Sequence, residues 1–167
     1  KELLRTTECF AGMDNALREL LAARMRKVAY PAGARIFAEG AAGEFMFVVA
    51  SGALRVLKRS ETGALVQIDV VGPGQCGGMT SLLLAEPRSA TLEASNDVML
   101  WVLRAEDFDQ LVTSRPEFAR ALLAFMSRHI RREARLMTRL APGGGAGFKV
   151  AVFDTKEFTR RTFTARN

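Results

Sequence analysis

The sequence is poor in the residues that build metal centres and disulfide frameworks. Its 167 residues include one histidine and two cysteines, Cys9 and Cys76. Two cysteines are too few to hold an iron–sulfur cluster or a structural zinc ion unaided, and they are no disulfide framework. We therefore expect two reduced thiols in a cytoplasmic protein, with no metal and no cofactor bound by this chain.

Long apolar runs and catalytic motifs are also missing. No run approaches the roughly 18 apolar residues of a membrane helix, so the sequence predicts a soluble protein without a membrane partner. The chain begins at Lys1 without a signal-like segment, and we expect a piece of a longer protein. It contains no GxGxxG motif, no P-loop and no evident Ser/His/Asp set, so no enzymatic activity is predicted for this chain alone.

Basic charge is present in excess but unevenly distributed. The net charge is +6, which invites a nucleic-acid interpretation. Many of the arginines crowd into residues 128–139 of one predicted helix and into the tail at 160–166. A solvated helix face explains them as well. Nothing after residue 140 resembles a helix-turn-helix, so we expect no DNA binding by this chain.

The middle of the sequence, residues 28–103, has the pattern of a β protein. Short apolar runs recur there, and each is closed by glycine or a polar turn. Residues 45–50 are nearly all apolar, which is typical of a strand buried on both faces, whereas residues 60–63, "SETG", predict a hairpin loop. Regular short strands with frequent turns predict a sandwich or a jelly-roll barrel.

Helical periodicity flanks these strands. Asp14 is a candidate cap for a helix over residues 14–25, and a long helix is predicted from about Glu117 to Leu140. The apolar stripe of the long helix extends beyond the expected footprint of the barrel, which predicts a parallel homodimer. The expected dimer residues are Leu122, Phe125, Met126, His129 and Ile130. The alternative is that the stripe folds back on its own barrel.

The stretch "GGMTSLLLAEPRSAT" has the chemistry of an anion site. Its glycines permit close backbone approach, and a short helix at about residues 79–83 would aim N–H groups at an oxyanion. An arginine held by the preceding proline would add a charge-assisted contact, and a serine would add a donor. The candidate phosphate-binding residues are Gly77, Gly78, Met79, Thr80, Arg88 and Ser89. In the alternative interpretation, Arg88 is a surface arginine in a turn.

Three stretches, taken together, resemble the cyclic-nucleotide-binding domain of the catabolite-activator and protein-kinase-A regulatory families. They are "YPAGARIFAEGAAGEFMFVVASGALRV" (30–56), "VGPGQCGG" (71–78) and "PRSAT" (87–91). The resemblance covers most of residues 10–140. It implies an α+β, mainly β fold: an eight-stranded jelly-roll β-barrel flanked by an N-terminal helix and a long C-terminal helix. It also implies a small phosphate ligand, with cAMP or cGMP as candidates.

The sequence departs from that family at two contacts. The family's cassette resembles F-G-E-L-A, and its glutamate accepts hydrogen bonds from the ribose; here Gly78 stands in its place. Glu86 and Glu93 look too exposed to substitute, and the hydroxyls of Thr80 and Ser81 are the other candidates. Glu133 and Ala134 align with the family's base-reading Thr-Ser pair. Such a domain can bind a cyclic nucleotide weakly or with altered base preference, bind another anion, or serve as a ligand-free dimerisation or docking scaffold.

The end of the chain predicts a second domain. Residues 1–140 form the expected ligand-binding domain, residues 141–147 ("APGGGAG") a glycine-rich linker, and residues 148–167 the start of a truncated domain. "KVAVFDTKEFTRRTF" (149–163) resembles the first strand of D-lactate dehydrogenases in the D-2-hydroxyacid dehydrogenase family. It implies a regulatory module fused to an NAD-dependent enzyme. The alternative is the sensor part of a transcription regulator that lacks its DNA-binding domain.

Overall fold

The computed structural model describes the backbone of residues 2–140 and the side chains of residues 4–132. The chain divides into two units, Lys1–Ser127 and Arg128–Asn167. The expected linker at 141–147 and the expected second domain at 148–167 lie outside the described residues. Their boundaries stay predictions.

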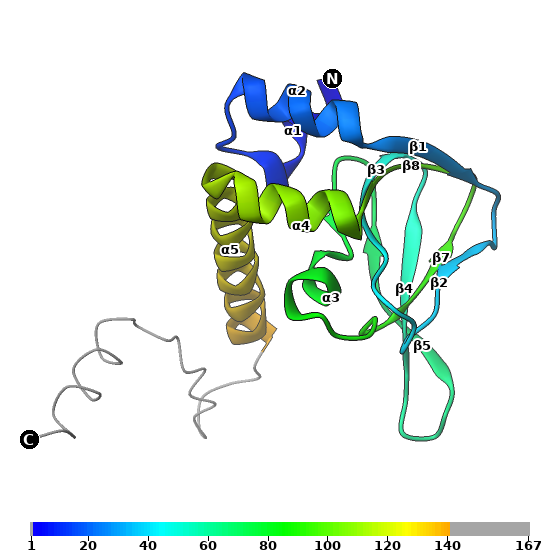
Figure 1. Ribbon diagram of the computed structural model, residues 1–167. Coiled ribbons are helices and arrows are strands. Elements are labelled where there is room, and N and C mark those ends of the chain that lie inside the picture. The colour runs from blue at the N-terminus through cyan, green and yellow to red at the C-terminus, as the bar shows by residue number, and fades with distance from the viewer. Residues whose placement is uncertain (1, 141–167) are drawn as a thin grey trace, which may run out of the picture. The chain divides into compact units, whose positions relative to one another are not determined.

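Eight strands of the described chain form two antiparallel four-stranded sheets (Figure 1). The first sheet has the order β1-β8-β3-β6 and the second the order β2-β7-β4-β5. This confirms the predicted mainly β, jelly-roll fold. The strands are β1 (Arg26–Tyr30), β2 (Arg35–Phe37), β3 (Phe45–Ser51), β4 (Leu54–Arg59), β5 (Leu65–Val71), β6 (Cys76–Gly77), β7 (Thr91–Ala94) and β8 (Val98–Arg104).

Helices lie at both ends of the strand region and within it (Figure 1). The Asp14 carboxylate accepts a hydrogen bond from the backbone N–H of Leu17 at 2.8 Å, which confirms the predicted cap. Pro116 is the first residue of the long helix, where its missing N–H costs no hydrogen bond. The helices are α1 (Glu2–Thr6), the 3-10 turn η1 (Glu8–Phe10), α2 (Asn15–Arg24), α3 (Met79–Leu84), α4 (Ala105–Ser114) and α5 (Pro116–Leu140).

Strand β3 connects two hydrophobic cores. Met46 and Val48 face a core shared with the helices, which we call the helix-side core. Phe47 and Val49 face the interior between the sheets, which we call the barrel core. All four side chains are at most 2% exposed, as expected for a strand that is buried on both faces.

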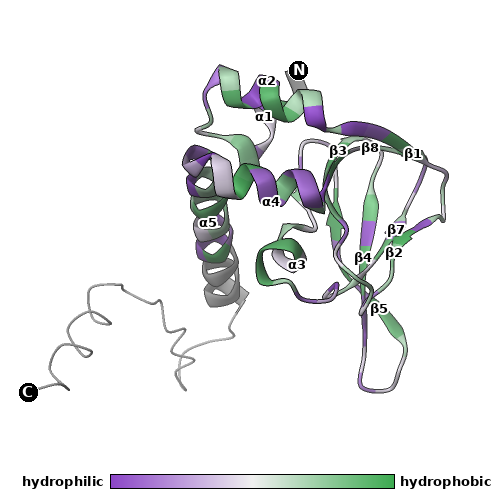
Figure 2. Ribbon diagram, in the orientation of Figure 1, coloured by the Kyte–Doolittle hydropathy of each residue, from purple (hydrophilic) through white to green (hydrophobic). Residues whose placement is uncertain are grey.

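Strand β5 differs from this pattern, because its apolar side chains are exposed. Leu65, Val66, Ile68 and Val70 are each 42–59% exposed, and Figure 2 shows the strand's hydrophobic colouring on the projecting hairpin. The hairpin loop agrees with the prediction, since the N–H of Ser60 donates to the carbonyl of Ala64 at 2.8 Å. Because β5 is an edge strand and pairs only with β4, no further strand covers it within the described part of the chain.

Candidate anion-binding cassette

The cassette starts on β6, which pairs with β3. Gly77 lies opposite Phe47, and a Cβ atom added to Gly77 would lie only 2.7 Å from the Phe47 ring. The absence of a side chain therefore lets the backbone of β6 approach the barrel core. Strand β6 ends here, and the chain turns into α3.

Gly78 makes that turn, in the left-handed region at φ +80°. A Cβ atom there would lie 2.7 Å from Nη1 of Arg88 and 2.9 Å from the carbonyl oxygen of Phe45. A glutamate would be strained and crowded at this position, so Gly78 is required by the turn. Met79, the next residue, is the first residue of α3. Met79 is 5% exposed and has no carboxylate either.

Arg88 is the central side chain of the site. It is 3% exposed, so the interpretation of a surface arginine is wrong. Its Nη1 donates to the carbonyl of Gly78 and to Oγ of Ser81, both at 3.0 Å, and its Nη2 donates to the carbonyl of Phe45 at 2.7 Å. The guanidinium thereby joins β3 to the start of α3.

Two aromatic rings enclose the Arg88 guanidinium. Its central carbon lies 4.2 Å from the centroid of Phe37 and 5.0 Å from that of Phe45. Burial lowers the pKa of Arg88 from its ordinary value and the charge of Glu44 opposes that shift, but an arginine stays cationic at neutral pH. The Nε atom is buried and makes no hydrogen bond in the described structure. The site therefore holds a desolvated cation whose Nε–H group makes no hydrogen bond within the described residues.

The main chain fixes Arg88 as well. Its N–H donates to the carbonyl of Ala41, and its own carbonyl accepts from the N–H of Gly40, both at 2.8 Å. The loop between β2 and β3 thus holds the residue in place from outside the cassette. Such pre-organisation reduces the conformational entropy that a ligand would have to remove.

The other predicted site residues are less closely gathered. Thr80 and Ser89 are exposed, and the carbonyl of Ser89 accepts a hydrogen bond from Nζ of Lys58. Ser81, by contrast, is 8% exposed, and its hydroxyl donates to the carbonyl of Gly78 at 3.1 Å. Ser81 is not among the phosphate-binding residues predicted from the sequence, which names it only as a possible hydroxyl in place of the missing carboxylate. Its position, three residues after Gly78 and hence one helical turn along, is the signal that could have identified it.

Sequence reasoning also missed the aromatic enclosure. Phe37 and Phe45 lie in different strands, and neither lies in the cassette. Their rings are 6.0 Å apart in an edge-on arrangement. No spacing rule joins two such positions to an arginine more than forty residues further along the chain. Only the sheet arrangement brings them together.

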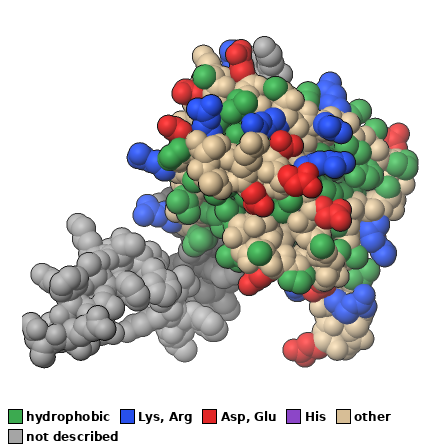
Figure 3. Space-filling view, viewed as in Figure 1, with side chains coloured by type: hydrophobic (Ala, Val, Ile, Leu, Met, Phe, Trp, Pro, Cys, Tyr) green, Lys and Arg blue, Asp and Glu red, His purple; other side chains and the backbone are tan. Residues whose placement is uncertain are grey.

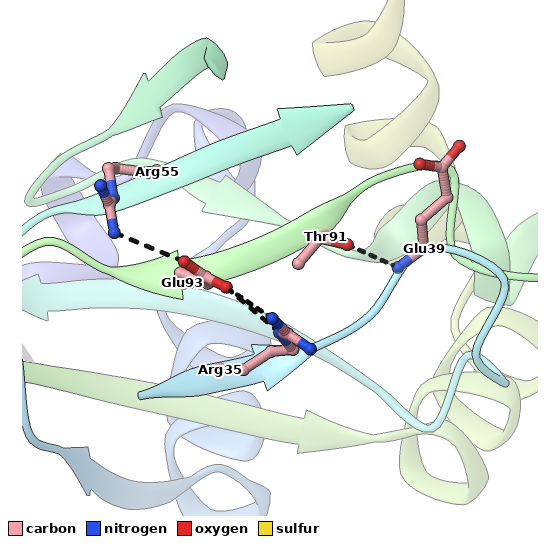
Figure 4. A network of polar contacts seen from close by, with 5 residues as sticks. All are labelled: Arg35, Glu39, Arg55, Thr91 and Glu93. Carbon is pink, nitrogen blue, oxygen red and sulfur yellow. Dashed lines mark hydrogen bonds and ion pairs between the residues drawn. The ribbon is translucent and has the colours of Figure 1, made fainter. Parts of the chain in front are cut away.

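Glu93, which the sequence predicts to be solvent-exposed, forms ion pairs with two arginines of neighbouring strands. Its side chain is 15% exposed and forms ion pairs with Arg35 at 3.1 Å and Arg55 at 3.4 Å. Figure 4 shows these pairs crossing from β2 over β7 to β4. Glu86 is exposed, as expected. Glu93 is thus an interstrand ion-pair partner, and the expectation of exposure is corrected.

The predicted dimer residues on α5 separate into two groups. Leu122 is 1% exposed in the helix-side core, so its assignment to a dimer interface is corrected: the stripe folds back on the protein's own core here. Phe125 and Met126 pack partly against that core. Ile130 is 65% exposed, and His129 is exposed too. The side chains of residues 133 and 134 lie outside the described residues.

The described residues show no second site of another kind, such as a one-sign charge patch on the face in view, a metal-ligand cluster or a membrane-spanning helix. On the face shown in Figure 3, acidic and basic side chains are interspersed among the described residues. The described part of the chain contains no group of three metal-ligating side chains. None of its helices is both long and apolar enough to cross a bilayer.

Comparison with known proteins agrees with this geometry. The model of the cyclic nucleotide-binding domain matches residues 27–115. The Cyclic AMP receptor protein of Thermus thermophilus is 30% identical over 128 residues, which are 77% of this chain and 59% of that protein. The CRP-like cAMP-activated global transcriptional regulator of Mycobacterium tuberculosis is 24% identical over 131 residues, which are 78% of this chain and 58% of that one.

Solved structures give the same result. The N-terminal domain of a transcriptional regulator from Streptomyces coelicolor is 32% identical, with a TM-score of 0.69 over 87% of this chain and 100% of that chain. The chain spans somewhat more than half the length of the two curated relatives, 58% and 59%. The family match covers the sheets, α3 and Arg88, and the chain belongs to the cyclic nucleotide-binding domain family.

Proposed function

We propose that this chain is a regulatory module that binds a cyclic nucleotide through its phosphate, and that Arg88 is the principal contact. The observation that carries the proposal is the 3% exposed Arg88 guanidinium, whose Nε–H group makes no hydrogen bond within the described residues, beside the first turn of α3. A cyclic phosphate carries one negative charge. A desolvated cation and the backbone N–H groups of a helix start are complementary to it.

We infer a weaker nucleotide site than the family pattern implies. Neither Gly78 nor Met79 supplies a carboxylate acceptor for the ribose. Losing a charged hydrogen bond costs about 1.5–3 kcal/mol, or roughly ten- to a hundredfold in affinity. Ser81 does not compensate freely, because its hydroxyl is already bonded to Gly78 and Arg88. We therefore expect this chain to bind cAMP or cGMP roughly ten- to a hundredfold more weakly than a domain that keeps the glutamate.

The functions of the relatives support a regulatory role. One is a receptor for cyclic AMP, one a cAMP-activated transcriptional regulator, and a third, from Mesorhizobium japonicum, a cyclic nucleotide-gated potassium channel. We propose that the module signals through α5 to a domain beyond residue 140. A D-2-hydroxyacid dehydrogenase stays the proposed partner domain, with a DNA-binding domain as the alternative. A homodimer through the exposed part of α5 stays a proposal as well.

A specific observation favours a second candidate, a ligand-free scaffold. The terminal nitrogens of Arg88 already donate to Phe45, Gly78 and Ser81. An arginine whose terminal nitrogens are hydrogen-bonded to the protein itself can have a purely structural role, which here is to link β3 to α3. In this candidate function the domain keeps the family's fold as a dimerisation or docking element.

Titration calorimetry of the folded protein with cAMP, cGMP and inorganic phosphate separates the candidates. We expect saturable heat with a cyclic nucleotide, and at least a tenfold loss of affinity in Arg88→Lys, which keeps the charge but loses the guanidinium geometry. Arg59→Lys, at the exposed end of β4, is the matched control and should bind like the wild type. Saturation by phosphate alone would favour a general anion site. Absence of heat with every ligand at millimolar concentration would refute the proposal and leave the scaffold.

A further inference from the structure

The two thiols of this protein meet in the tertiary structure, although 67 positions separate them in sequence. Cys9 is fully buried in η1, within the helix-side core. Cys76 lies on β6, is half-buried and packs against the same core. The two side chains lie within hydrogen-bonding reach of each other, and both are free thiols.

The strand register explains why they meet. Cys76 lies opposite Val48 in the pairing of β6 with β3. Residues paired in this way point to the same face of a sheet, and Val48 faces the helix-side core. Cys76 therefore points toward the helices, where the N-terminal segment carries Cys9. Gly77, the next residue, faces the barrel core beside Phe47.

We propose that Cys9 and Cys76 form a reversible intramolecular disulfide, and that this thiol pair is an oxidation site directly behind the anion-binding cassette. A peroxide is the oxidant. The sulfur of Cys76 attacks one peroxide oxygen, which gives a sulfenic acid and releases hydroxide. The sulfur of Cys9 then attacks the Cys76 sulfur and forms the S–S bond, and the displaced hydroxyl group takes the Cys9 proton and leaves as water. Overall, two thiols and one hydrogen peroxide give one disulfide and two waters.

Exposure sets the order of these steps. Cys76 is partly accessible, whereas Cys9 has no exposed surface. Burial, with the neighbouring thiol of Cys76, also raises the pKa of Cys9, so Cys9 stays protonated until a sulfenic acid has formed beside it. Cys76 is thus the thiol that meets the oxidant, and Cys9 is the resolving thiol. Such a resolving partner protects a cysteine from further, irreversible oxidation.

The location of the pair connects it to the site, and this part of the inference rests on the proposed function. Cys76 is followed directly by Gly77 and Gly78, whose positions depend on tight contacts with Phe47, Phe45 and Arg88. Drawing the two sulfurs to bonding distance displaces β6 or η1. We therefore expect the disulfide to change the affinity of the cassette for a cyclic nucleotide.

The test treats the folded chain with hydrogen peroxide and maps the cysteines by mass spectrometry without reduction. We expect a monomer that has lost two hydrogens, a cross-linked Cys9–Cys76 peptide, and return of both thiols with dithiothreitol. Cys9→Ala, the variant without the resolving thiol, should instead carry a sulfinic acid on Cys76. Cys76→Ala should stay unoxidised at Cys9. The wild-type peptide map decides the question even if a variant fails to fold.

Other outcomes overturn the proposal. These are retention of both free thiols after oxidation, sulfinic acid at Cys76 in the wild type, or a disulfide between two chains. A second experiment measures by calorimetry the affinity of the oxidised and of the reduced protein for cAMP, and its result does not affect the test of the disulfide. If neither form binds, the proposed function fails while the disulfide stands. If both bind equally, the connection between the thiol pair and the cassette fails.

Discussion

Strands β3 and β5 are similar in sequence and opposite in environment. Each has seven residues, "FMFVVAS" and "LVQIDVV", and each is mostly apolar. Nevertheless, the four central residues of β3 are buried, whereas every residue of β5 but the last is exposed. The difference shows that apolar content by itself does not determine which strand becomes central.

Position in the sheets accounts for the difference. Strand β3 pairs with both β8 and β6, and its alternate residues enter the helix-side core and the barrel core. Strand β5 pairs only with β4. Exposed apolar edge strands are pairing and aggregation sites, so an uncovered β5 is a surface that needs a partner or protection.

The largest expected effect comes from truncating matched apolar side chains in the two strands. Met46→Ala in β3 removes a fully buried side chain and should cost about 2–5 kcal/mol of unfolding free energy. Ile68→Ala in β5, where the side chain is 59% exposed, should stay within about 0.5 kcal/mol. Urea unfolding measures both. Equal losses would mean that β5 is buried in solution, for example in an oligomer.

An intermediate effect is expected at two glycines that share a backbone conformation. Gly78, with φ +80°, abuts the β3 carbonyl of Phe45, whereas Gly74, with φ +79°, has open space around it. Alanine at either position meets the same backbone strain, but Gly78→Ala adds overpacking that costs about 1–3 kcal/mol more. Thermal unfolding of the two variants measures that difference. A similar Tm in both would show that the cassette moves away from β3 freely.

The smallest effect is expected at the ion pair between Glu39 and Lys58. Glu39 accepts hydrogen bonds from Nζ of Lys58 and from the N–H of Arg59 in β4, and these contacts lower its pKa from the ordinary 4.5. A lowered folded-state pKa stabilises the protein above pH 4.5, and the contribution disappears as pH falls through the folded value. Glu39→Gln should therefore be slightly less stable than the wild type at neutral pH, and the difference should vanish in acid. A gap that widened in acid would contradict this sign.

Much of the cassette could be predicted from its own residues. Arg88 after Pro87, and the Gly77–Gly78 pair before a short helix, carry their chemistry locally. The role of Ser81 needed the geometry of one helical turn. The enclosure by Phe37 and Phe45 could not be predicted, because it joins residues of different strands whose register no local signal specifies.

The sequence by itself determined the elements: the Asp14 cap, the hairpin at Ser60–Gly63, the turn at Gly78 and the helix start at Pro116. Each depends on a side-chain or backbone property that acts within a few residues. Only the tertiary structure decided which apolar strand is central, that Leu122 belongs to the protein's own core, and that Cys9 meets Cys76. These are contacts between distant segments, and they depend on how the sheets and helices share their buried faces.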